Sequence, residues 1–280
     1  MPELAYVNGR VTPVSEATVS IEDRGFQFAD GVYEVARSYN GKPIDLDRHL
    51  ARMGRSAAML DLPLPMSLSE LQHVAEGFYA SSHLPEAVLY LQLTRGAGPR
   101  QHVGAPGLTP TLVMTVRPVL RTTPAEFTVI TVPNNRWLMC ACKSVALLPA
   151  VLAKHEAVKA GADEAIFVAD DGTVLEGASD NIFAVKAGVY YTPRADGRIL
   201  AGITRERVLE QLAARGAEVR VGDMTINFLR AADEAFITSS VLTVVPVVGI
   251  DGRPIGDGKI GSAATAVKED YWRFIREVTA

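Results

Sequence analysis

The stretch Val32-Tyr33-Glu34-Val35-Ala36-Arg37-Ser38-Tyr39-Asn40-Gly41 decides the fold class. Apolar and polar residues alternate through it, which is typical of a β-strand, and the Asn-Gly pair then predicts a tight hairpin turn. Asn8-Gly9 lies between two short strand patterns in the same way. Hairpins of this kind join antiparallel strands, whereas parallel strands need a long crossover connection.

Helical patterns follow these hairpins. Apolar residues recur at helical spacing from Leu46 to Leu60, and Ser67 with Glu70 forms a capping box that starts another helix. Further strands are predicted over 87–94, 111–116, 127–132, 165–169, 173–176, 182–185 and 235–238. Strands and helices are mixed without a regular βαβ repeat, so we expect an α+β fold with mixed sheets.

A break between two domains is predicted at residues 118–124, which contain two prolines and little periodicity. With 280 residues the chain is long enough for two domains. We expect a smaller N-terminal domain over 1–117 and a larger C-terminal domain over 125–280.

Composition excludes several classes of protein. The chain is 48% hydrophobic and 21% charged, with a net charge of −4, so nothing favours nucleic-acid binding. We find neither a signal peptide nor an apolar run of membrane-spanning length, and we expect a cytoplasmic setting. Cys140 and Cys142 are too few ligands for a structural zinc site, and we predict two core residues on one face of a strand and no metal.

Lys143 lies in the apolar run Trp137–Leu148, and no Asp or Glu occurs between Glu126 and Glu156. Burial without a counter-charge favours the neutral amine, which can attack a carbonyl carbon. One interpretation of Lys143 is therefore a Schiff-base lysine. The other is a surface lysine at the end of a strand.

Two sites in the second half could bind a phosphate group. Thr204 follows a glycine where a helix N-cap belongs, and Thr238-Ser239-Ser240 places three hydroxyls at the end of a strand. Glu176 ends a strand before a glycine turn and could hold a proton on a pyridine nitrogen. An ordinary cap, an ordinary turn and a solvent-facing glutamate are the alternatives. Pyridoxal phosphate needs this combination of a lysine, an acid and a phosphate site.

A possible carboxylate-binding set lies in the first half. Arg100 and His102 alternate in a loop rich in glycine and proline, so both side chains can point one way. Tyr33 could add a hydroxyl. The alternatives are an exposed loop with solvated charge and an ordinary strand tyrosine.

The order and spacing of these motifs over nearly the whole chain resemble those of the class IV aminotransferases, the fold-type IV pyridoxal-phosphate enzymes. Within that family the chain is most similar to D-amino acid transaminases. The matching motifs are 22–28 with 30–35, Thr94-Arg95-Gly96 with Pro99, Arg100 and His102, Arg136-Trp137-Leu138 with Cys140 and Lys143-Ser144, 150–154, Glu176-Gly177 with Ser179, Asn181 and Phe183, 202–205, and Thr238-Ser239.

The resemblance implies a role for each candidate residue. Lys143 would form the Schiff base with pyridoxal 5′-phosphate, and Glu176 would partner its pyridine nitrogen. The implied phosphate and ring contacts are Arg52, Leu200, Ile203, Thr204, Ser239 and Ser240. The implied carboxylate-binding residues are Tyr33, Arg100 and His102, and the loop that carries Arg100 and His102 would reach in from the partner subunit of a homodimer.

The implied reaction is ping-pong transamination of a D-amino acid, such as D-alanine, with 2-oxoglutarate or pyruvate. The alternatives with the same cofactor are a branched-chain L-amino acid transaminase, an (R)-amine transaminase and an aminodeoxychorismate lyase. A non-catalytic protein on the same scaffold is the alternative from another class.

Overall fold

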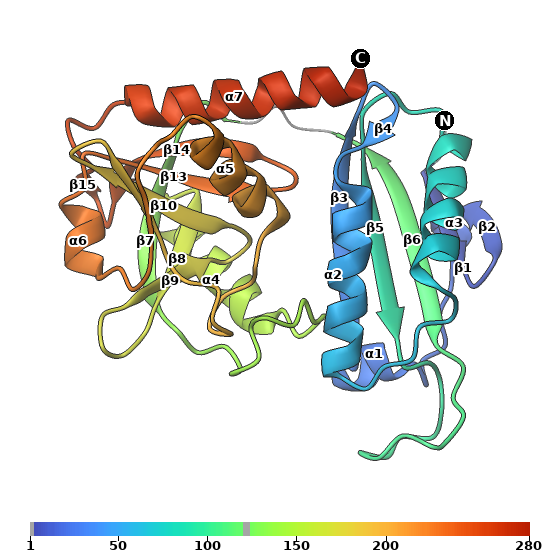
Figure 1. Ribbon diagram of the computed structural model, residues 1–280. Helices are drawn as coiled ribbons and strands as arrows, with labels where there is room; N and C mark the ends of the chain where they lie inside the picture. Colours follow the sequence, from blue (N-terminus) through green and yellow to red (C-terminus); the bar gives the residue numbers. More distant parts are fainter. Residues whose placement is uncertain (1–2, 120–123) are drawn as a thin grey trace. The chain divides into compact units, whose positions relative to one another are not determined.

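The computed structural model describes residues 3–119 and 124–280, and it divides into two compact units (Figure 1). The first unit holds the described residues within 1–121, together with 142–146 and 278–280. The second unit holds those within 122–141 and 147–277. Most of the predicted linker 118–124 lies outside the described residues, so a division of the chain there stays a prediction.

The first unit is built on a six-stranded sheet with the order β2-β1-β6-β5-β3-β4, in which every neighbouring pair is antiparallel. Its strands are β1 Leu4–Val7, β2 Arg10–Pro13, β3 Gly31–Tyr39, β4 Lys42–Pro43, β5 Ala87–Thr94 and β6 Thr111–Pro118. Asn8 and Gly9 have φ values of 45° and 94°, and Asn40 and Gly41 have 47° and 78°. Positive φ at both central residues is what a type I′ hairpin turn requires, so both predicted hairpins are confirmed.

Two helices pack against this sheet, α2 Leu46–Met59 and α3 Leu68–Ser81, and Figure 1 shows both beside β3, β5 and β6. Leu50 and Met53 of α2 are buried, as the helical spacing predicts. The predicted capping box is present, since Ser67 Oγ accepts from the Glu70 backbone N–H and Glu70 accepts from that of Ser67. Two short helices, η1 Val14–Glu16 and α1 Arg24–Phe28, precede β3.

The second unit contains a nine-stranded mixed sheet with the order β12-β11-β10-β13-β14-β7-β8-β9, and β15 pairs with β14. Its strands are β7 Phe127–Pro133, β8 Glu164–Val168, β9 Val174–Gly177, β10 Asn181–Lys186, β11 Val189–Thr192, β12 Val219–Val221, β13 Glu234–Ser239, β14 Thr243–Ile250 and β15 Arg253–Pro254. The β14–β7, β7–β8 and β11–β12 pairs are parallel and the others are antiparallel. Mixed sheets combined with helices confirm the predicted α+β class.

Four helices accompany this sheet: α4 Leu148–Lys159, α5 Ile203–Ala214, α6 Ile226–Arg230 and α7 Ser262–Thr279. The last two residues of α7 belong to the first unit. The sequence reasoning missed β14, although this strand lies in the middle of the sheet. Seven of its eight residues are buried on both faces, so apolar and polar residues do not alternate along it.

Candidate active site

Lys143 lies in an irregular segment, not at the end of a strand. Backbone contacts fix its position, because the Tyr33 N–H donates to the Lys143 carbonyl at 3.0 Å and the Lys143 N–H donates to Ser56 Oγ at 3.0 Å. The half-buried side chain places Nζ 4.2 Å from the centroid of the Tyr33 ring. No carboxylate among the described residues of the first unit forms an ion pair with Lys143. The described residues of the first unit thus give the amine an aromatic neighbour and no ion-pair partner.

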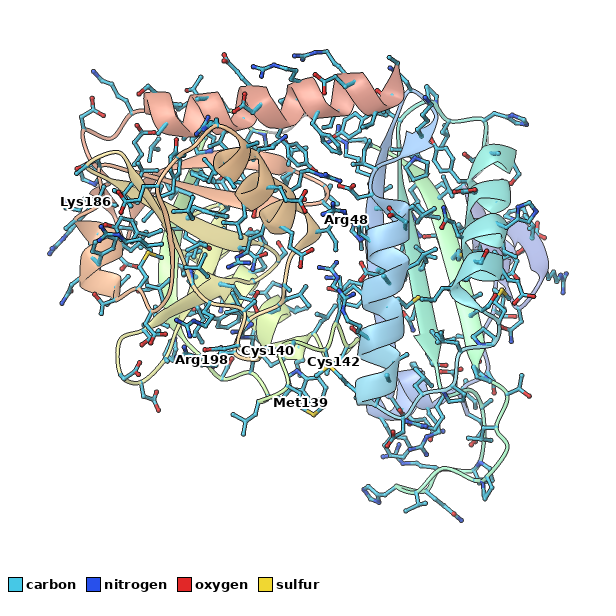
Figure 2. The ribbon with its side chains drawn as sticks, in the orientation of Figure 1. Arg48, Met139, Cys140, Cys142, Lys186 and Arg198 are labelled. Atoms are coloured by element: carbon cyan, nitrogen blue, oxygen red, sulfur yellow. The ribbon has the colours of Figure 1, made fainter. Side chains whose placement is uncertain are left out.

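The predicted placement of the two cysteines on one face of a strand is wrong. Both are free and buried, but Cys140 belongs to the second unit and Cys142 to the first (both are labelled in Figure 2). The Cys142 thiol lies 3.5 Å from the Ser56 carbonyl, and burial raises its pKa to about 11. A thiol with so high a pKa is a poor nucleophile at neutral pH.

Arg52, a residue expected at the phosphate, forms a buried ion pair with Glu34 in the first unit. Its Nε and Nη2 donate to the two Glu34 carboxylate oxygens at 2.7 and 2.8 Å, and His49 Nδ1 lies 2.7 Å from Glu34 Oε2. Burial raises the pKa of Glu34, but the hydrogen bonds and charges of Arg52 and His49 outweigh it and hold the pKa at about 2. Glu34 therefore fixes the orientation of the Arg52 guanidinium.

Tyr33 lies on β3 beside Lys143. Its ring stacks on that of Tyr90 of β5, with centroids 5.8 Å apart and planes at 29°. The Tyr90 hydroxyl donates to Gln92 Oε1 at 2.6 Å, and burial, with the nearby Tyr33, raises the pKa of Tyr90 to about 12. The two stacked rings hold Tyr33 against the lysine.

Arg100 and His102 are exposed residues of the loop between β5 and β6. Both contact the ring of Phe28 from α1: the Arg100 guanidinium carbon lies 4.7 Å from its centroid, and the His102 ring centroid lies 5.9 Å away. The structure thus brings the two predicted carboxylate ligands together on one aromatic side chain.

Glu176 lies in β9 of the second unit, next to the last residue Gly177, and its side chain is buried. One carboxylate oxygen accepts from Arg136 Nη1, and the other accepts from the Leu200 N–H at 3.0 Å and from Asn181 Nδ2 at 3.2 Å. Asn181 Nδ2 also donates to the Leu200 carbonyl at 3.0 Å. A guanidinium and two further donors therefore fix the orientation of this carboxylate. The sequence reasoning did not identify Arg136 as the partner of Glu176.

The helix α5 begins at Ile203, and its N-cap is Gly202, so the prediction that Thr204 occupies the N-cap is wrong. Thr204 lies in the first turn and is buried. A Cβ on Gly202 would lie 2.0 Å from Asn181 Oδ1, so only glycine fits there. The amides of a first helical turn lack partners within the helix, and they attract anions. Asn181 thereby links Glu176 and Leu200 to the start of α5.

The hydroxyl residues at the end of β13 lie near the same point of the sheet. Asn181 of β10 is paired with Thr238 of β13, and Ser239 follows directly. Ser239 Oγ accepts from the Leu242 N–H at 3.2 Å, whereas the buried Thr238 Oγ1 has no hydrogen-bond partner among the described residues. Ser240 is the next residue along this turn.

The side chains of the second unit fit the ring nitrogen and the phosphate of a phosphorylated pyridine cofactor. The second unit brings together the Glu176 carboxylate, the first turn of α5 and the hydroxyls around Ser239, through Asn181 and the pairing of β10 with β13. The first unit contains Lys143, Tyr33, Arg52, and the loop with Arg100 and His102.

The described residues hold neither a candidate metal cluster nor a membrane-spanning helix. They contain no group of three or more His, Cys, Asp or Glu side chains that could hold a metal ion. None of the helices they form is long and apolar enough to cross a membrane.

Relatives match this chain along nearly its whole length. The D-alanine aminotransferase of Bacillus licheniformis is 40% identical over 276 residues, which cover 98% of this chain and 97% of the relative. That of Staphylococcus haemolyticus is 37% identical over 276 residues, with 96% and 97% covered.

Solved structures share the fold. The T.th. branched-chain amino acid aminotransferase, complexed with N-(5′-phosphopyridoxyl)-L-glutamate, superposes with a TM-score of 0.90 at 29% identity, covering 98% of this chain and 94% of that one. A fold IV transaminase of Curtobacterium pusillum gives 0.84 at 28% identity, covering 96% and 98%. The model of the family "Amino-transferase class IV" matches residues 31–250. This chain therefore belongs to the class IV aminotransferases, the fold-type IV family of pyridoxal-phosphate-dependent enzymes.

Proposed function

We propose that this chain transfers the amino group of D-amino acids, such as D-alanine, to a 2-oxo acid such as 2-oxoglutarate or pyruvate. The observation that carries the proposal is the set of relatives, 37–40% identical over 96–98% of this chain, that are named D-alanine aminotransferase. The exchange is ping-pong: a D-amino acid leaves as its oxo acid before a second oxo acid takes up the amino group. The free cysteines suit a reducing compartment, and we propose the cytoplasm.

Lys143 is the proposed catalytic amine. It would bind the aldehyde carbon of pyridoxal 5′-phosphate, and after the substrate amine replaces it, it would remove the proton from the substrate Cα. No carboxylate among the described residues of the first unit forms an ion pair with Lys143, which supports this role, because such a pair would compete with the aldehyde for the amine. Tyr33, 4.2 Å from Nζ, limits where the amine can point.

Glu176 is the proposed partner of the pyridine nitrogen. Its buried carboxylate accepts hydrogen bonds from Arg136, Asn181 and the Leu200 backbone, which fix its orientation, and a carboxylate fixed beside a ring nitrogen can hold a proton there. When bound, the cofactor supplies an electron sink that stabilises negative charge at the substrate Cα. Leu200, whose backbone binds Glu176, is the proposed ring contact.

The proposed phosphate site combines the amides of Ile203 and Thr204 with the hydroxyls of Thr204, Ser239 and Ser240. Arg52 would add its charge in the orientation that Glu34 fixes.

Arg100 and His102, with Tyr33, are the proposed ligands of the substrate carboxylate. A planar guanidinium binds a carboxylate through two parallel hydrogen bonds, and their shared contact with Phe28 keeps the two side chains together. We propose a homodimer in which this exposed loop completes the site of the partner subunit.

A branched-chain L-amino acid transaminase is the second candidate function, because such enzymes give TM-scores of 0.90 at 29% identity. Steady-state assays with D-alanine, L-leucine and (R)-1-phenylethylamine as amino donors to 2-oxoglutarate decide between them. We expect D-alanine to have the highest kcat/KM. Faster turnover of L-leucine would replace the first candidate by the second, and faster turnover of the amine would exclude both.

A further inference from the structure

The loop between β5 and β6 is held by a buried arginine of α1. Arg24 is 5% exposed, and its Nη1 and Nη2 donate to the backbone carbonyls of Gln101 and His102 at 2.6 and 2.9 Å. Its Nε donates to Asp30 at 2.8 Å. One guanidinium therefore binds two successive peptide units next to the proposed carboxylate ligands, and it sets the direction of the loop there.

Asp30 ties this guanidinium to the start of the loop. Its carboxylate also accepts from Arg95 Nε at 2.8 Å and Nη2 at 3.1 Å, and Arg95 donates in turn to the carbonyls of Leu60 and Asp61 after α2. Burial raises the pKa of Asp30, but the hydrogen bonds and charges of Arg95 and Arg24 outweigh it and lower the pKa below its ordinary value. The carboxylate thus stays ionised between two fixed cations.

Phe28 connects Arg24 to the side chains that the loop presents. The guanidinium carbons of Arg24 and Arg100 lie 4.8 and 4.7 Å from the Phe28 centroid, and the His102 ring also contacts it. On the loop, Gly104 approaches closely, since a Cβ there would lie 3.3 Å from Arg24 Nε. Backbone and side chains of the loop therefore both depend on Arg24.

Polar contacts, not core packing, hold the loop in this place. A hollow of about 540 Å³ lies between Arg24, Asp30, Arg95 and the loop residues 102–108. The loop residues from Arg100 to Val103 are exposed. Loss of the hydrogen bonds from Arg24 would leave little apolar contact to keep the loop fixed.

We propose that Arg24 is a positioning residue that places Arg100 and His102 for recognition of the substrate carboxylate. It contacts neither substrate nor cofactor and acts through the carbonyls of Gln101 and His102. This inference rests on the proposed function, in which Arg100 and His102 bind that carboxylate.

The test is Arg24→Lys in the full-length holoenzyme. Lysine keeps the charge but cannot donate from one plane to Asp30 and two carbonyls at once. We expect KM for D-alanine and for 2-oxoglutarate to rise about tenfold or more, because a displacement of about 1 Å can cost a hundredfold. We expect a smaller change in kcat and unchanged cofactor absorbance. Hydrogen exchange of the peptide amides over 97–108 should become faster.

Two further variants test the positioning role of Arg24 separately from the proposed binding of the carboxylate by Arg100 and His102. Arg37→Lys changes another buried arginine of the first unit, which pairs with Glu86, and it should lower stability without raising KM. Arg100→Ala should raise KM by itself. The double variant Arg24→Lys with Arg100→Ala should have a KM little higher than that of Arg100→Ala alone. If Arg100→Ala leaves KM unchanged, the proposed carboxylate site is wrong. If Arg100→Ala raises KM and Arg24→Lys does not, only the positioning role is wrong.

Gly104→Ala disturbs the contact between the loop and Arg24 from the side of the loop. It therefore tests the proposal even if Arg24→Lys does not fold. The added methyl group would press on Arg24 Nε and Arg95 Cδ, both 3.3 Å from the ideal Cβ position. We expect a smaller rise in KM, of about threefold, at unchanged cofactor content. Unchanged KM and unchanged loop exchange in Gly104→Ala would overturn the proposal.

Discussion

Replacing Asp180 by Asn should make the protein more stable, and the gain should grow with pH. Asp180 follows β9 and is 7% exposed, and neither of its carboxylate oxygens has a hydrogen-bond donor among the described residues. Its neighbour is the carboxylate of Glu164, which is fully buried and accepts from Lys154 and Ser179. Burial, the charge and contact of Glu164, and the charge of Glu176 raise the pKa of Asp180 well above its ordinary value, although Lys154 opposes this. A proton on Asp180 lets it donate to Glu164.

The magnitude follows from this one proton. Below the unfolded pKa of about 3.9, Asp180 is protonated in both the folded and the unfolded state, so its raised pKa does not lower the free energy of unfolding. As pH rises above that value, the unfolded state loses the proton while the folded state keeps it. The free energy of unfolding therefore falls by about 1.4 kcal/mol per pH unit until the folded pKa is reached. Asparagine has the same shape, and its side-chain amide can donate to Glu164 without titrating. The Asp180→Asn protein therefore avoids this fall in the free energy of unfolding.

The assay is thermal or urea unfolding of the native protein and Asp180→Asn from about pH 4, near the unfolded pKa, to about pH 8.5. The stability difference should increase by about 1.4 kcal/mol per pH unit, or roughly 2–4 °C in Tm per kcal/mol, and then level off. Asp170→Asn, in the exposed turn before β9, is the matched control and should show no such trend. A difference for Asp180→Asn that does not change with pH would refute the shared proton.

Three further predictions concern the proposed site. Lys143→Ala should abolish turnover and the visible absorbance of the lysine-bound cofactor, which a spectrum and a D-alanine assay check; full activity would remove Lys143 from the mechanism. Glu34→Gln should lower the free energy of unfolding by about 3–5 kcal/mol at pH 7, because it leaves the buried Arg52 without its charge partner. Since the pKa of Glu34 is about 2, urea unfolding should show this deficit shrinking as pH falls below the unfolded value of about 4.3, and a deficit constant down to pH 2 would contradict the ion pair. Arg136→Met removes a donor to Glu176 and should lower kcat about tenfold or more with little change in KM for D-alanine, and an unaltered kcat would show that Glu176 needs no such partner.

Local signals were sufficient for the turns and helix starts. The Asn-Gly hairpins at Asn8 and Asn40 and the capping box at Ser67 depend on residues a few positions apart, and each is where the sequence predicts it. Strand β14 was missed because a strand buried on both faces carries no alternating pattern. The N-cap was assigned to Thr204, two residues after its actual position at Gly202, because glycine has no side chain with which to cap, although Asn181 requires a glycine there.

The contacts that shape the site could not be read from sequence, because they join distant residues. Arg136 and Glu176 are 40 positions apart, and Arg24 binds carbonyls 77 and 78 positions away. The segment around Lys143 looked like a strand because it is apolar, but its backbone bonds go to Tyr33 and Ser56 of another part of the chain. Motif spacing identified the residue types, and only the fold shows which of them touch.

The most direct test of the central claim is the absorbance of the native holoenzyme during single half-reactions. On addition of D-alanine without an acceptor, the band of the lysine-bound cofactor should disappear and pyruvate should form in equal amount, and 2-oxoglutarate should restore the band. L-alanine and L-leucine should leave the band unchanged. A response to L-leucine and none to D-alanine would contradict the assignment of this chain as a D-amino acid transaminase.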